Sequence, residues 1–185
     1  ETSSVIEAKR LVLEVRAAGV PIDEAREQLR ERLVHAMRWG HALVLRMSDS
    51  AAAFVSGYCE ATTFPVDVFD RSLMPEGDLR SDSPLAKVLR PEDVAQTGGR
   101  FFVPSHFKVV VTSTFDEHIY EERLQHSLPL HLLQPIRVLP SHHNESSEGA
   151  GRIQAQCVVQ TMAMARTRQD EGSEGSDGAR GPSGE

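Results

Sequence analysis

Two unbroken aliphatic runs stand out in the pattern of hydrophobic and polar positions. The first is Leu43 to Leu45, and the second is Val109 to Val111, which ends at the hydroxyl residues Thr112, Ser113 and Thr114. Runs without polar alternation are typical of strands covered on both faces, and such strands mostly belong to parallel sheets flanked by helices. We therefore expect an α/β fold in which the two runs lie side by side and ligands bind where strands end.

The clearest helical pattern follows Pro21. Apolar residues recur there at helical spacing, acidic residues occupy the first turn, and Gly40 can end the helix in the left-handed conformation. We expect Arg30, Glu31 and Arg32 to form a solvated outer face. The apolar stripe consists of Ala25, Leu29, Leu33, Ala36 and Met37.

Weaker patterns predict the remaining elements. Residues 4–18 have helical spacing, with a strand at 11–15 as the alternative, and Trp39 is expected in the core or in a groove at the end of its helix. Pro135 confines any strand at 134–139 to an edge or to a late start. The other predictions are short helices at 51–58, 84–89 and 117–125, and a hairpin joining 100–103 to 107–111.

These patterns divide the chain into an N-terminal helical or linker segment at 1–20, an α/β core at 21–140 and a low-complexity tail at 141–185. The tail is rich in Gly, Ser and Glu, so we expect it to be disordered apart from a short helix at 152–168. The apolar surface of that segment suits helix-in-groove docking, which makes a calmodulin-type partner one hypothesis. The alternative is a terminal helix or strand that packs back on the domain.

Composition narrows the function classes. The net charge of −7 argues against a protein that binds duplex nucleic acid. No apolar run approaches the roughly 20 residues of a membrane span. Cys59 and Cys157 have no metal-ligand spacing, so we expect a reducing, cytoplasmic compartment. Because residue 1 is Glu rather than Met, a processed chain or a fragment is expected.

Metal and hydrolase chemistry find little support in the sequence. The eight histidines include His126, His131, His142 and His143, but no two of these have the His-x3-His spacing with a supporting Glu. Solvated or capping histidines are therefore expected, and no metal site. The sequence also has no Gly-x-Ser-x-Gly elbow, so a catalytic triad is not predicted.

The order of these patterns resembles the AAA+ modules of dynein heavy chains, a family of P-loop NTPases. In that family a helix leads into the Walker B strand, matched here by Arg38-Trp39-Gly40 followed by 41–45. A hairpin then leads into the sensor I strand, matched by 101–103 and 107–114, and the last core strand is matched by 132–138. The resemblance covers about residues 21–140. It implies a protein-binding module in a cytoskeletal or ciliary setting, with ATP and Mg²⁺ as the ligands of the family.

The departures from the family pattern argue against catalysis. The chain has no Gly-x4-Gly-Lys-Ser/Thr loop to hold phosphates. Arg46 stands where the resemblance places the metal-linked acid, and Asp49 is the nearest carboxylate. Thr112 and Thr114 stand where a sensor hydroxyl would contact the γ-phosphate, and the alternative is that they satisfy local backbone.

From these observations we expect a degenerate, non-catalytic AAA+-like scaffold or protein-interaction domain, whose sheet lacks the phosphate-loop portion. No residue is expected to be catalytic and no cofactor is expected. If a nucleotide binds, the predicted contacts are Asp49, Thr112, Ser113 and Thr114. The alternative from the enzyme class is a fragment of an ATPase whose phosphate-binding loop, and hence ATP and Mg²⁺ binding, is supplied by upstream sequence.

Overall fold

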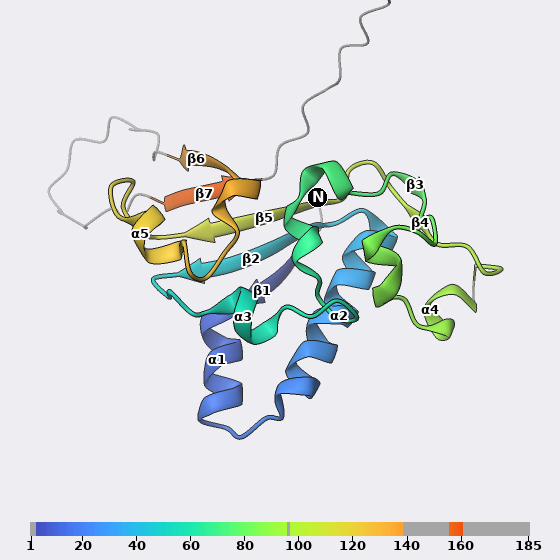
Figure 1. Ribbon diagram of the computed structural model, residues 1–185, viewed down its shortest axis with the longest axis horizontal. Helices are drawn as coiled ribbons and strands as arrows, with labels where there is room; N and C mark the ends of the chain where they lie inside the picture. The colour runs from blue at the N-terminus through green and yellow to red at the C-terminus, as the bar shows by residue number, and fades with distance from the viewer. Residues whose placement is uncertain (1–2, 96, 139–155, 161–185) are drawn as a thin grey trace, which may run out of the picture.

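A computed structural model describes residues 3–95, 97–138 and 156–160 of the chain. Its main sheet has five strands in the order β1-β2-β5-β7-β6. Strands β1, β2 and β5 run parallel, whereas β7 runs antiparallel to both β5 and β6 (Figure 1). The strands are β1 Ser3–Glu7, β2 Ala42–Ser48, β5 Lys108–Ser113, β6 Gln134–Val138 and β7 Gln156–Gln160; a separate pair joins β3 Gly77–Asp78 to β4 Phe102–Val103.

Helices and 3₁₀ turns fill the connections between the strands. In Figure 1, α1, α2 and α3 lie on the same side of the sheet. The α-helices are α1 Ala8–Arg16, α2 Ile22–Trp39, α3 Phe54–Tyr58, α4 Pro91–Ala95 and α5 Tyr120–Leu124. The 3₁₀ turns are η1 Val66–Phe69, η2 Arg71–Leu73, η3 Pro84–Val88 and η4 Leu130–Leu132.

The α/β class and the adjacency of the two aliphatic runs are confirmed. Leu43 to Leu45 of β2 pair in parallel register with Val109 to Val111 of β5. The prediction that both faces are covered is wrong, because burial alternates along both strands. Leu45 is fully buried, whereas Val44 is half-buried and Arg46 is exposed. Among the described residues, helices α1, α2 and α3 lie on one side of the sheet (Figure 1).

Helix α2 forms as the sequence predicts. The five residues of its apolar stripe are at most 1% exposed. Gly40 ends the helix with φ 65°, a left-handed conformation that other residues adopt only with strain. Trp39, however, is 58% exposed, so the expectation that it lies in the core is wrong, and the alternative, a groove at the end of the helix, stays a prediction.

The expected solvated face of α2 is partly wrong as well. Glu31 and Arg32 are exposed, but Arg30 is only 5% exposed. Its guanidinium donates to the Asp93 carboxylate at 2.6 Å and to the Val88 carbonyl at 3.2 Å. Asp93 belongs to α4, a short helix that the sequence did not indicate. The segment from η3 to α4 therefore covers Arg30, which the helical pattern alone places on the solvent-facing side of α2.

The N-terminal segment is a strand followed by a helix, rather than the single helix predicted for 4–18. In β1, Val5 pairs with Val44 and Ile6 pairs with Leu45, and Ile6 is buried. The five residues of β1 have no alternating apolar pattern long enough to predict a strand. Its pairing with β2, 39 residues away in register, decides its conformation.

The shorter elements are partly as expected. Helix α3 begins at Phe54 rather than Ala51, and η3 begins where predicted, with the Ser83 hydroxyl accepting from the Leu85 N–H at 3.3 Å. The predicted hairpin is wrong, since β4 pairs with β3 and not with β5. α5 is shorter than the predicted 117–125 helix. The edge position of the strand that contains Pro135 is confirmed.

Residues 156–160 form β7, so the helix predicted for 152–168 is wrong for these five residues. The alternative, a strand that packs back on the domain, is confirmed for them. The other residues of that segment lie outside the described part of the chain, as do His142 and His143. Among the described residues, no helix is long and apolar enough to cross a membrane.

Candidate functional site

The candidate site lies at the carboxyl edge of the parallel strands β1, β2 and β5. Parallel pairing places Glu7, Arg46 and Thr112 in one row across the three strands, and Ser48 pairs with Ser113. Ligands of parallel α/β sheets usually bind at this edge. The fold thus brings the end of the first aliphatic run beside the end of the second, as the sequence predicted.

Arg46 forms an ion pair across the first two strands. Its Nη1 donates to Glu7 Oε1 at 2.6 Å, and the two side chains are 47% and 37% exposed. A divalent cation needs carboxylate oxygens that are not already neutralised. Glu7 is the carboxylate in the row of Glu7, Arg46 and Thr112, and Arg46 neutralises it.

Asp49 is engaged with α1 rather than with the hydroxyl residues of β5. Its Oδ1 accepts from Lys9 Nζ at 3.2 Å, and both side chains are more than 60% exposed. The hydrogen bond from Lys9, followed by one within Asp49's own backbone, lowers the pKa of the Asp49 carboxyl below its ordinary value. The structure does not bring Asp49 into hydrogen-bond contact with Thr112, Ser113 or Thr114.

A register shift separates Arg46 from Ser48 at the end of β2. Ser48 has φ 53°, a left-handed conformation that is uncommon for serine. Its carbonyl accepts from the Thr114 N–H at 2.9 Å and from the Ser113 hydroxyl at 3.3 Å. The bulge therefore directs a main-chain acceptor of β2 toward the end of β5.

Ser113 is fully engaged in this arrangement. It is 1% exposed, its hydroxyl donates to the Ser48 carbonyl, and the same oxygen accepts from the Phe115 N–H at 3.1 Å. Both roles of the hydroxyl are used by main chain. The geometry therefore fits a strand-end hydroxyl that satisfies local backbone, the alternative that the sequence left open.

Thr112 differs from its neighbour. Its Oγ1 is buried and has no hydrogen-bond partner among the described residues. Thr114 is half-buried and contributes its N–H to Ser48. Of the four residues predicted to contact a nucleotide, the structure places Thr112, Ser113 and Thr114 together at one strand end and directs Asp49 to Lys9.

The local sequence pattern does not indicate Glu7 and Lys9, the two residues that form ion pairs with Arg46 and Asp49. Both lie at the junction of β1 and α1, which the sequence predicted to be one helix. No short motif marks them. The one signal in the sequence is that their charges are opposite to those of the residues they pair with, Arg46 and Asp49. This complementarity can be recognised only once β1 and β2 are known to pair.

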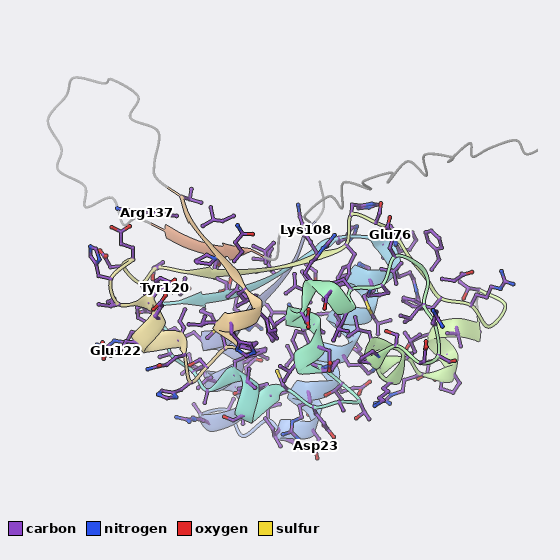
Figure 2. All side chains as sticks on the ribbon, turned by 45° about the horizontal axis from the view of Figure 1, so that its top comes forward. Asp23, Glu76, Lys108, Tyr120, Glu122 and Arg137 are labelled. Carbon is purple, nitrogen blue, oxygen red and sulfur yellow. The ribbon has the colours of Figure 1, made fainter. Side chains whose placement is uncertain are left out.

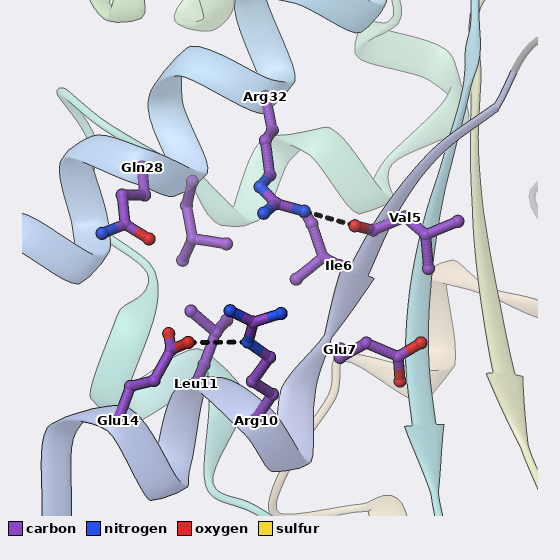
Figure 3. Close-up of a pocket in the computed structure, with 9 residues that line it drawn as sticks. Val5, Ile6, Glu7, Arg10, Leu11, Glu14, Gln28 and Arg32 are labelled. Atoms are coloured by element: carbon purple, nitrogen blue, oxygen red, sulfur yellow. Dashed lines mark hydrogen bonds and ion pairs between the residues drawn. The ribbon is translucent and has the colours of Figure 1, made fainter. Parts of the chain in front are cut away.

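A concavity of about 180 Å³ lies between the outer edge of β1 and helices α1 and α2. Figure 3 shows Arg10 and Arg32 extending into it from the two helices. Arg32 donates to the Val5 carbonyl, and Arg10 donates to Glu14 at 2.7 Å. Arg10 is thus neutralised by Glu14, whereas Arg32 is held by a main-chain carbonyl. The concavity is not lined by Arg46, Asp49 or the hydroxyl residues of β5.

Two further concavities, of about 310 and 400 Å³, adjoin α5 and η4. Both include Gln125, Leu130 and His131, and the larger also includes His126. Figure 2 shows Tyr120 and Glu122 of α5 at the same end of the sheet as Arg137, with Lys108 at the other end of β5. Within the described ranges, no group of three or more His, Cys, Asp or Glu residues is arranged to hold a metal ion.

Comparison with known proteins adds no family to this geometry. No protein-family model, curated protein or solved structure that was compared with the chain matches it.

Proposed function

We propose that the chain is a non-catalytic, AAA+-like α/β module that serves as a scaffold or protein-interaction domain. The ion pair between Arg46 and Glu7 carries this proposal. The resemblance puts the metal-linked acid of an ATPase at position 46. An arginine at this position, paired with the Glu7 carboxylate, cannot coordinate Mg²⁺ and cannot act as a base for an attacking water.

Two other features support the same conclusion. The strands that resemble Walker B and sensor I are parallel neighbours, as the resemblance requires. The Ser113 hydroxyl at the second strand end donates its one hydrogen to the Ser48 carbonyl, so it has no donor left for a phosphate oxygen. The strand pairing supports an AAA+-like arrangement, and the engaged Arg46, Glu7 and Ser113 side chains support a module that does not hydrolyse ATP.

ATP hydrolysis and Mg·ATP binding by the purified chain test the non-catalytic part. We expect neither, and we expect the amide resonances of Thr112 to Thr114 to stay unchanged on addition of Mg·ATP. Hydrolysis that Thr114→Ala abolishes would refute the proposal. The same assay on the chain with its natural upstream sequence tests the alternative, an ATPase completed by an upstream phosphate loop.

An exposed tryptophan supports the interaction part. Trp39 is 58% exposed at the end of α2, and its ring lies 6.4 Å from that of His35. Exposed tryptophan is uncommon outside binding surfaces, where it often contributes most of the affinity. We expect Trp39→Ser to lose protein partners that Leu73→Ser, an exposed control on η2, retains. The cytoskeletal or ciliary setting implied by the resemblance is checked by localising the tagged chain in ciliated cells.

A further inference from the structure

Strand β7 occupies an unusual position in the sheet. Its neighbours β5 and β6 both run antiparallel to it, so they are parallel to each other, and β7 lies between them in the opposite direction. Residues 157–160 have Cα partners on both sides: Val110 to Ser113 on β5, and Gln134 to Arg137 on β6. In Figure 1 the β7 arrow points opposite to those of β5 and β6.

Strand β6 adds no buried side chain to the described hydrophobic core. The buried apolar side chains whose burial the structure describes come from positions 6 to 133, and all five residues of β6 are exposed or half-buried. The main described contacts of β6 are with β7. β5, in contrast, is also held by β2. Release of β7 would therefore open one edge of β5 while β2 still holds its other edge.

An open edge of this kind pairs with extended segments through main-chain hydrogen bonds. The segment that the structure shows in this position is Gln156–Gln160. It is connected to β6 by the 17 residues 139–155, a length that can span at most roughly 60 Å when extended. That reach is enough for the strand of one molecule to enter the sheet of another, and exchange of an identical element preserves every pair in the register.

We propose that β7 is an exchangeable strand, and that the slot between β5 and β6 accepts residues 156–160 of a second copy of the chain as well as its own. Copies of the chain then associate by reciprocal strand exchange. The proposal depends on main-chain pairing at β5, and it is independent of the nucleotide chemistry discussed above.

A designed disulfide identifies which molecule supplies β7. Arg137 and Cys157 are direct Cα partners. Along an antiparallel ladder, hydrogen-bonded and non-hydrogen-bonded residue pairs alternate. Pro135 has no N–H, so its pair with Val159 fits the non-hydrogen-bonded type. Arg137 is two residues further along β6, so its pair with Cys157 is of the same type. The Cα separation of such pairs, about 4.5 Å, lies within the range of roughly 4.4 to 6.8 Å that a disulfide spans.

The experiment oxidises full-length Arg137→Cys with oxidised glutathione over roughly a hundredfold range of chain concentration. Burial raises the pKa of the Cys59 thiol to about 12, which keeps it from competing at neutral pH. Peptide mapping then locates the link between positions 137 and 157. If strands exchange, the fraction of chains linked as dimers should rise with chain concentration. When heavy-isotope-labelled and unlabelled chains are combined before oxidation, dimers that contain one chain of each kind should form.

Exclusively intramolecular links at every concentration would overturn the proposal. So would dimers that lack the link between 137 and 157, or the absence of that link altogether. A proline variant supplies the control: Val159→Pro, added to Arg137→Cys, removes a ladder hydrogen bond of β7 and should reduce both forms of the link at least tenfold.

Discussion

The guanidinium of Arg30 and the carboxylate of Asp93, 63 residues apart in the chain, form a buried ion pair with an N–O separation of 2.6 Å. Their side chains are 6% and 14% exposed. Asp93 also accepts from the Arg90 N–H at 2.8 Å, and its carbonyl accepts from Arg38 at 2.6 Å. The pair joins α2 to α4 and fixes the long connection between β2 and β5 against the helix layer.

Arg30→Ala should therefore destabilise the fold strongly. It leaves the half-buried Asp93 carboxylate with Arg38, at 3.8 Å, as its remaining cation, and the loss should lower the free energy of unfolding by up to about 3 to 5 kcal/mol, the cost of breaking a fully buried pair. Arg30→Lys should cost less, since a single ammonium can keep the charge but not all the hydrogen bonds of the guanidinium. Urea denaturation measures both.

Arg80→Ala is the matched control, because Arg80 is 82% exposed and pairs only with Asp82 among its described ion pairs. We expect its free energy of unfolding to stay within about 0.5 kcal/mol of the wild type. Equal losses at positions 30 and 80 would contradict the structural role assigned to the buried pair.

Gly40 and Gly57 should respond oppositely to alanine. Gly40 has φ 65°, and a Cβ there would lie 2.4 Å from Nε2 of the exposed His106 ring. The ring can move aside, so the left-handed backbone dominates, and Gly40→Ala should destabilise by about 1 to 2 kcal/mol. Gly57 lies in α3 with open space around it, and Gly57→Ala should stabilise by up to about 1 kcal/mol. Thermal unfolding of the two variants tests this difference in sign.

Thr112 and Ser113 are adjacent hydroxyl residues with opposite hydrogen-bond states. Ser113→Ala leaves the Phe115 N–H without its acceptor and should lower the free energy of unfolding by about 1 to 2 kcal/mol. Thr112→Val removes a buried hydroxyl that has no partner among the described residues, so it should be neutral or stabilising. If Thr112→Val proved the more destabilising of the two, the assignment of Ser113 as the structural hydroxyl would be wrong.

The Asp49 carboxyl should titrate at an abnormally low pH. Its pKa is lowered in the folded chain, chiefly by Lys9, so the carboxylate stabilises the fold above its unfolded pKa of about 3.9. That contribution is lost as the pH falls through the lower, folded pKa. Carbon-detected NMR titration should show the pKa of Asp49 rising in Lys9→Ala, whereas Lys87→Ala should leave it unchanged. Added salt should weaken the effect, because both side chains are exposed.

The sequence was most informative where a local pattern and the tertiary environment agree. Helix α2 has its apolar stripe, its acidic first turn and its terminal Gly40 within one continuous segment, so its limits could be predicted. The runs in β2 and β5 are apolar enough to form strands in most surroundings, and their adjacency follows from the preference of such strands for parallel sheets.

Where pattern and environment differ, the sequence was misleading. β1 is a strand because β2 offers it an edge, and β4 pairs with β3 because the connection folds back there. Arg30 is buried because α4 packs against it, and nothing near position 30 indicates that contact. Hydrogen-bond pairing and burial of a charge depend on partners tens of residues away, which a local pattern does not contain.

By itself, the sequence determined the α/β class, the helix that ends at Gly40, the two adjacent strands and the arginine at the position of an expected acid. Only the tertiary structure decided that this arginine is held by Glu7, that burial alternates along β2 and β5, and that β7 enters the sheet between β5 and β6. The reason is physical: the propensity of a residue is local, whereas the partner of a charge, a sheet face or a strand edge is set by the whole chain.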